Sequence, residues 1–115
     1  MQFRTLILLL ATNLALLGCG KPVPVEKSTF VGEWQNKTMY LLITQEGSVV
    51  YKRLDGGVSK SIEGPLKGFK GDNFEVGIGP LSKEFKVSVP PHDEDGEWKM
   101  VVDGAELTKT EETEE

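Results

Sequence analysis

Cysteine and histidine are nearly missing from this sequence, in which each occurs once. A single cysteine excludes an internal disulfide and any Cys-x-x-Cys metal or redox site. No Gly-x-Ser-x-Gly motif and no nucleophile paired with a general base is visible, so we predict a non-enzyme without catalytic residues or cofactors. The 18 acidic side chains outnumber the 13 lysines and arginines, which argues against nucleic acid as a partner.

A long apolar run is missing too. Residues 5–17 form the main apolar stretch, and it is shorter than the ~20 residues that a transmembrane helix needs. A short lead with one positive charge, at Arg4, precedes it, which is the layout of a secretory signal peptide. The usual small-x-small cleavage site is replaced by Leu16-Leu17-Gly18-Cys19.

This tetrapeptide, Leu16-Leu17-Gly18-Cys19, resembles the lipobox of bacterial lipoproteins. The resemblance implies that residues 1–18 are a signal peptide, cut off before Cys19, and that the Cys19 sulfur carries a diacylglyceryl group. Two or more acyl chains, such as palmitate, anchor a protein firmly in a lipid bilayer. In a Gram-negative host, Gly20 in place of aspartate implies sorting to the outer membrane, facing the periplasm. The alternative is an ordinary signal peptide with an incidental cysteine.

The remaining chain divides into three parts. Residues 19–28 are the lipidated cysteine and a tether, in which Pro22 and Pro24 predict an extended, semi-rigid spacer. Residues 29–109 are predicted to form one β domain. Residues 110–115 are predicted to be an acidic, disordered tail, because like charges without apolar side chains remain solvated. Loss of Arg4 with the signal peptide changes the formal net charge from −5 to −6.

Short alternating runs of apolar and polar residues, separated by turn residues, predict strands throughout the domain. Turn chemistry is expected at Gly64-Pro65 and, as a closing hairpin, at Asp103-Gly104. Strands with one buried and one solvent-exposed face are typical of antiparallel sheet. The predicted fold is therefore all-β, a small antiparallel meander forming a barrel or a sandwich. The predicted strands are residues 29–35, 39–45, 49–54, 58–63, 66–70, 73–78, 83–89, 97–102 and 106–109.

The same alternation predicts the core. One face of each of three strands is apolar, and these faces carry Phe74, Val76 and Ile78, then Phe85, Val87 and Val89, then Trp98, Met100 and Val102.

The first predicted strand contains Gly32-Glu33-Trp34, which resembles the lipocalin-type Gly-x-Trp entry motif. In that motif the tryptophan plugs one end of a barrel. The arginine that partners it near the final strand of lipocalins is absent here. The interior of a small eight-stranded barrel can be filled by side chains, so Trp34 is interpreted as a core residue. A role for Trp34 in lining a ligand pocket is the alternative.

The only histidine lies in an acidic stretch, residues 90–97. Calcium takes several carboxylate ligands, which makes Asp93, Asp95 and Glu97 the candidate metal ligands of the chain. The glycine falls at the wrong place for an EF-hand loop, and an exposed acidic loop is the favoured interpretation. A second cluster, Tyr40 with residues 51–53, combines aromatic and basic side chains, although ordinary strand packing explains it.

Two functions from different classes remain. The first is a membrane-anchored envelope lipoprotein that works as an accessory protein-binding module. Its acidic exterior would select basic partners, for instance a cationic hydrolase such as lysozyme, although the cysteines and signature loop of lipoprotein lysozyme inhibitors are absent. The second is a lipocalin-like carrier of small ligands in the periplasm. An interior packed with side chains would favour the first, and an apolar cavity the second.

Overall fold

The computed structural model describes residues 20–110. The signal peptide, the lipobox with its predicted lipidation site Cys19, and residues 111–115 of the predicted acidic tail lie outside the described residues. Nine strands and one short 3-10 helix, η1, are present in the described part. Their bounds are η1 (Val25–Phe30), β1 (Gly32–Gln35), β2 (Met39–Ile43), β3 (Ser48–Asp55), β4 (Val58–Lys70), β5 (Asn73–Ile78), β6 (Leu81–Phe85), β7 (Val87–Glu94), β8 (Glu97–Val102) and β9 (Ala105–Lys109).

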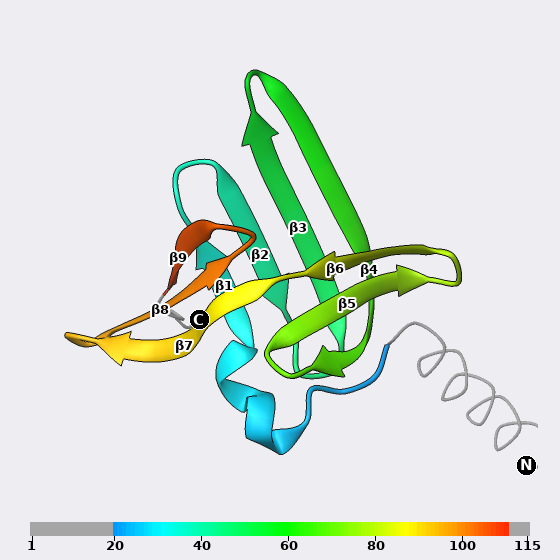
Figure 1. Ribbon diagram of the computed structural model, residues 1–115, viewed down its shortest axis with the longest axis horizontal. Coiled ribbons are helices and arrows are strands. Elements are labelled where there is room, and N and C mark those ends of the chain that lie inside the picture. Colours follow the sequence, from blue (N-terminus) through cyan, green and yellow to red (C-terminus); the bar gives the residue numbers. More distant parts are fainter. Residues whose placement is uncertain (1–19, 111–115) are drawn as a thin grey trace, which may run out of the picture.

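All nine strands belong to one antiparallel sheet with the order β6-β5-β4-β3-β2-β1-β9-β8-β7. The sheet curls into a half-barrel (Figure 1), so the prediction of an all-β antiparallel fold is confirmed. Neighbouring strands in the sheet follow each other along the chain, except where β1 pairs with β9 through Trp34↔Lys109 and Gln35↔Thr108.

The two edge strands of this sheet, β6 and β7, are consecutive in the chain, with Lys86 alone between them. The Lys86 N–H donates to a carboxylate oxygen of Asp103 at 2.9 Å, and the Asp103 N–H donates to the Lys86 carbonyl at 2.8 Å. The next amide, of Val87, donates to the side-chain oxygen of Asn73 at 2.8 Å. Residues from both halves of the sheet therefore hold the corner at which the chain passes from one edge to the other.

The core lies inside the curl of the sheet. Phe74, Val76, Phe85, Met100 and Val102 of the predicted core are buried, as is Val87. Ile78 and Val89 were predicted to be core residues as well, but both are exposed, and Trp98 is only partly buried. Ile78 is the last residue of β5, where the neighbouring strand β4 has turned away, so most of its side chain is left exposed.

Two predicted divisions between strands are wrong, and the two errors cancel in the number of strands. The expected turn at Gly64-Pro65 does not form, because β4 runs for 13 residues through it and changes partner from β3 to β5. The expected strand 83–89 is divided at Lys86 into β6 and β7. In addition, residues 29 and 30 are helical, not extended.

The closing hairpin predicted at Asp103-Gly104 is confirmed, with positive φ angles of 50° and 79° at its two turn residues. The acidic stretch is also a hairpin, which corrects the interpretation as an exposed loop. Strand β7 continues to Glu94, and Asp95-Gly96 make the turn into β8. Two prolines, Pro90 and Pro91, are tolerated in β7 because an edge strand leaves one row of backbone groups unpaired.

The predicted spacer is packed onto the domain. Val23 is buried, its N–H donates to the Gln45 carbonyl at 3.0 Å, and the Gln45 side-chain amide donates back to the Val23 carbonyl. Residues 25–28 belong to η1, which leads to the buried Phe30. An apolar side chain two residues before the helix thus draws the proline-rich segment against the end of the sheet.

Candidate functional site: a groove beside an open strand edge

An apolar concavity lies between the first half of β4 and the β5–β6 hairpin, and we call it the β4–β5 groove. Its volume is about 540 Å³. Ile78 and Leu81, at the tip of the hairpin, are 72% and 81% exposed. The lining residues are Ser61, Ile62, Glu63, Gly64, Val76, Gly77, Ile78, Pro80, Leu81, Ser82 and Lys83.

The groove exists because β4 and β5 diverge. Strand β5 pairs with residues 66–70 of β4, and a bulge between Leu66 and Gly68 ends the regular register. Gly77 keeps β5 close to β6 at this point, since a Cβ there would overlap the Leu81 carbonyl oxygen, and its φ of 140° disfavours other residues. The divergence leaves residues 58–64 of β4 bonded to β3 on one side only, within the part of the chain that the structure describes.

The direction of the backbone groups on this edge follows from the register. The two-residue turn Gly56-Gly57 makes Asp55↔Val58 a hydrogen-bonded pair, and such pairs alternate along an antiparallel ladder. In agreement, the Leu66 N–H, an even number of residues away from Val58, donates toward the β3 side, to the Gly47 carbonyl. The amides and carbonyls of the intervening positions therefore point away from β3, and these positions are Ser59, Ser61 and Glu63.

Trp34, the other sequence candidate, is fully buried, as the core interpretation predicts, and its indole N–H donates to the Phe30 carbonyl at 2.9 Å. A cation lies over the Trp34 ring, but it is a lysine and not the arginine of the lipocalin-type motif. The Lys109 ammonium, on the last strand, lies 5.0 Å from the Trp34 ring centroid and donates to the Thr29 carbonyl of η1 at 3.1 Å. A lysine on the last strand therefore lies against Trp34, where the lipocalin-type resemblance implies an arginine.

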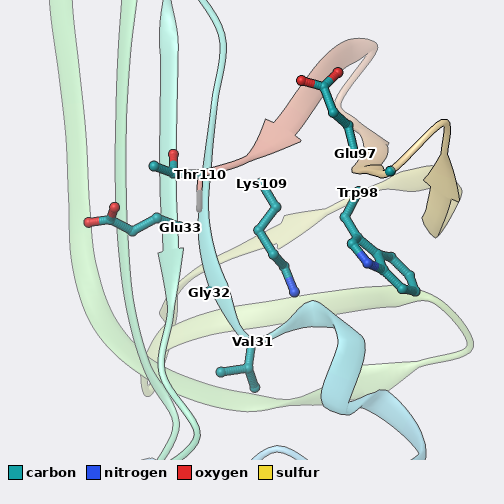
Figure 2. Close-up of a pocket in the computed structure, with 8 residues that line it drawn as sticks. Val31, Gly32, Glu33, Glu97, Trp98, Lys109 and Thr110 are labelled. Atoms are coloured by element: carbon teal, nitrogen blue, oxygen red, sulfur yellow. The ribbon is translucent and has the colours of Figure 1, made fainter. Parts of the chain in front are cut away.

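A second concavity of about 490 Å³ surrounds this lysine, between β1 and the β8–β9 strands. In Figure 2 the Lys109 side chain points down between Trp98 and Val31, whereas the Glu33 carboxylate points away from it. Its ammonium is also 5.7 Å from the Trp98 ring centroid, and burial lowers the pKa of Lys109. Since the ammonium is engaged with Thr29 and two indole rings, its geometry is that of a structural residue and not of a ligand-binding residue.

The aromatic and basic cluster around Tyr40 separates into two parts. Tyr51 is buried and packs edge-on against Phe85, at 5.1 Å between ring centroids. Tyr40 faces outward, where its hydroxyl donates to Glu33 at 2.8 Å and the Lys52 ammonium lies 5.9 Å from its ring centroid. Desolvation, together with the Glu33 carboxylate, raises the pKa of Tyr40 to about 12. Ordinary packing on opposite faces of the sheet accounts for these contacts.

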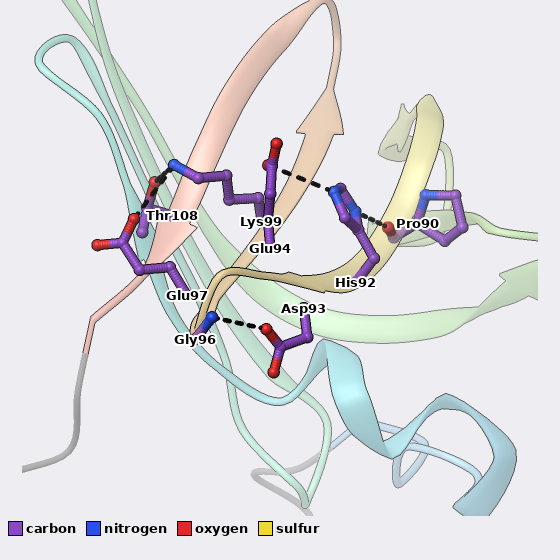
Figure 3. Close-up of polar contacts among 8 residues, drawn as sticks. All are labelled: Pro90, His92, Asp93, Glu94, Gly96, Glu97, Lys99 and Thr108. Carbon is purple, nitrogen blue, oxygen red and sulfur yellow. Dashed lines mark hydrogen bonds and ion pairs between the residues drawn. The ribbon is translucent and has the colours of Figure 1, made fainter.

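Two of the three candidate metal ligands, Asp93 and Glu97, point in different directions at the β7–β8 turn (Figure 3). The Asp93 carboxylate accepts the Gly96 N–H at 2.8 Å and so closes the turn, and the Glu97 carboxylate is 3.5 Å from the Lys99 ammonium. Asp95 holds a turn position with a φ of 54°. Among residues 20–110, no three metal-ligating side chains come together as a site.

No protein-family model, curated protein or solved structure matches the chain. In the range covered by the structure, no helix combines the length and apolar character needed to cross a membrane. The physical features of the molecule itself therefore carry the functional interpretation.

Two features of the site escaped the sequence analysis. Lys109 lies two residues after Leu107, and the period of two would have placed it on the inner face beside Trp34. The sequence analysis assigned no role to Gly77, yet a glycine inside a strand often indicates a close approach of another backbone. The divergence of β4 from β5 has no local signal, because alternation continues through it.

Proposed function

We propose that the protein is a lipid-anchored bacterial envelope lipoprotein that binds an extended segment of a partner protein as an additional strand on β4. The single observation behind this proposal is the open edge at Ser59, Ser61 and Glu63, which lies beside an apolar groove. Strand addition uses such edges, since backbone hydrogen bonds supply affinity while pockets for alternate side chains supply specificity.

The chemistry of the occupant follows from this geometry. Its backbone would bond to β4, and every second side chain would point into the groove. Ile62, Ile78 and Leu81 would receive apolar side chains of the incoming segment, and the opposite side chains would remain in water. The exposed tip of the β5–β6 hairpin would lose its contact with water at the same time.

The packed interior supports a protein-binding module over a lipocalin-like carrier. The inner side chains of the half-barrel are buried against each other, with Phe74 and Phe85 stacked at 4.9 Å between ring centroids. Both concavities described above lie at the surface. The covered Trp34 nevertheless resembles the lipocalin arrangement, so small-ligand binding in the β4–β5 groove is the second candidate.

A proline substitution on the open edge tests the proposal. Ser61→Pro removes an outward N–H, and edge strands tolerate proline at such positions, so the fold is expected to survive. Ser61→Thr keeps the N–H and serves as the matched control. The probe is a soluble peptide of alternating valine and threonine, followed by NMR of the amides of β4.

We expect the peptide to shift and protect the amides of Ser59, Ser61 and Glu63 in the native chain and in Ser61→Thr, and to bind neither edge nor groove in Ser61→Pro. Equal binding by both variants would contradict strand addition. If decanoate shifts Ile78 and Leu81 and remains bound in Ser61→Pro, the carrier is favoured instead.

The anchor is tested separately by mass spectrometry of the protein from its native host. The proposal requires a mature chain that begins at Cys19 and carries acyl chains on it. Cys19→Ser should release the protein from the membrane fraction. An unmodified thiol at Cys19, or a different mature end, would refute lipid anchoring and leave the groove experiment unaffected.

A further inference from the structure

The segment just after Cys19 is built into the domain. The Lys21 N–H donates to the Leu66 carbonyl at 3.1 Å, and the Val23 N–H donates to the Gln45 carbonyl at 3.0 Å. The segment therefore bonds both to the β2–β3 turn and to β4 at its bulge. We call residues 20–24 the mount.

Two glycines permit this close approach. A Cβ on Gly20 would lie 2.5 Å from the Leu66 nitrogen and 2.7 Å from the Gly47 carbonyl oxygen. A Cβ on Gly47 would overlap the Lys21 carbonyl oxygen, and its φ of 99° also favours glycine. Since the obstructing atoms belong to the backbone, a larger residue at either position would push the mount off the sheet.

The mount enters at one defined end of the half-barrel. Figure 1 shows the mount crossing the end of the half-barrel that holds η1, whereas the β3–β4 hairpin projects at the opposite end. Val25, which follows the mount, is 86% exposed at this same end. The eight residues of β3 separate the two ends by about 24 Å, because strand residues rise by ~3.4 Å each.

We propose that the mount makes the end of the domain around the β2–β3 turn a lipid-facing surface, so that the domain stands on the bilayer in one orientation without a flexible spacer. This inference rests on the proposed lipid anchor at Cys19, which is one peptide bond from Gly20. The open edge of β4 then faces away from the lipid, where a partner in the aqueous compartment can reach it.

Two labelling positions distinguish the two ends. Glu46 lies in the exposed β2–β3 turn, and Ser59 lies at the start of β4, beside the β3–β4 turn. In the lipidated protein, each of the two residues is replaced by cysteine in a separate variant. Each is labelled with bimane and reconstituted in vesicles of phosphatidylethanolamine and phosphatidylglycerol that contain a headgroup nitroxide lipid. We expect the nitroxide to quench the label at position 46 several-fold more strongly than the label at position 59.

Gly20→Val is the variant that releases the mount, and Lys21→Ala, which keeps the bonded N–H, is its matched control. Release should equalise quenching at the two positions and remove the hydrogen-exchange protection of the Lys21 and Val23 amides, with strand amides still protected. Insertion of a Gly-Ser spacer between Cys19 and Gly20 should abolish quenching at position 46 while protection of the mount remains.

Equal quenching at positions 46 and 59 in the native lipidated chain would overturn the fixed orientation but not the anchor. Unprotected Lys21 and Val23 amides in a folded native chain would overturn the mount itself. A mass spectrum without acyl chains would remove the anchor, and with it this inference, whatever the result at the groove.

Discussion

Two regions of the half-barrel use similar strands but differ in how their apolar side chains are covered. At the first region, which we call the closed end, η1, Trp34 and Lys109 interlock, and the mount bonds to the β2–β3 turn and to β4. At the second region, which we call the open end, β4 separates from β5 beside the tip of the β5–β6 hairpin, and Ile78 and Leu81 project into water. A domain of this size gains little from leaving apolar side chains exposed, so the difference indicates an end built for stability and an end available for contact.

The largest expected effect comes from the closed end. Trp34→Ala removes a fully buried indole and its hydrogen bond to Phe30, and it should cost about 3–5 kcal/mol of unfolding free energy. Ile78→Ser at the open end should change stability by less than ~0.5 kcal/mol. Urea unfolding followed by circular dichroism measures both. Comparable losses would show that the two ends do not differ in the way described.

The second prediction concerns the glycine that shapes the groove. Gly77→Ala should cost about 2–3 kcal/mol, since its Cβ would overlap the Leu81 carbonyl and its φ of 140° is strained for alanine. Gly79→Ala is the control, because it also has a positive φ, of 56°, but its Cβ would meet no atom within 4 Å. A Gly79→Ala loss as large as that of Gly77→Ala would exclude the steric explanation.

The third prediction removes the cation of the closed end. Lys109→Met keeps the apolar stem but loses the bond to Thr29 and the contact with the Trp34 ring, which should cost about 1–2 kcal/mol. Lys99→Met, on the neighbouring strand, loses only a contact with Glu97 and a bond to Thr108, so a change below ~0.5 kcal/mol is expected. Thermal unfolding of the two variants side by side tests whether the loss of stability is specific to Lys109.

The smallest effect is confined to alkaline pH. Because the pKa of Tyr40 is raised from 10.0 to about 12, the unfolded chain loses this proton first, and Tyr40 lowers stability as pH rises from 10 to 12. Burial lowers the pKa of Lys109, so this group acts in the opposite direction just below its ordinary value of 10.5. Tyr40→Phe isolates the tyrosine: its stability should fall less than that of the native chain over this range, as measured by urea titrations at each pH.

Local patterns in the sequence predicted the elements that local chemistry determines. The strands 73–78 and 97–102 have their predicted bounds because clear alternation is flanked by turn residues on both sides. The turn predicted at Gly64-Pro65 failed because Pro65 directs its missing N–H away from β3, where no bond is lost. The corner at Lys86 depends on Asn73 and Asp103, which lie far away in sequence, and so no window around residue 86 reveals it.

The candidate site shows the same division. Alternation placed Val76 inside correctly, but it equally placed Ile78 inside, because it records which face a side chain is on and not whether another strand covers that face. Coverage depends on the angle between β4 and β5. Likewise, prolines at 22 and 24 gave the mount its extended backbone, while its attachment depends on the distant residues Gln45 and Leu66.

The pairing of the first strand with the last has a consequence for the order of folding. Gln35 bonds to Thr110 across 75 positions, and the Thr110 N–H donates to the Glu33 carbonyl. Contacts so distant in sequence form slowly, because a long loop must be closed before they contribute. A nascent chain that has not yet delivered β9 would leave β1 without one neighbour and Trp34 without Lys109, so the sheet cannot close before β9 has been synthesised.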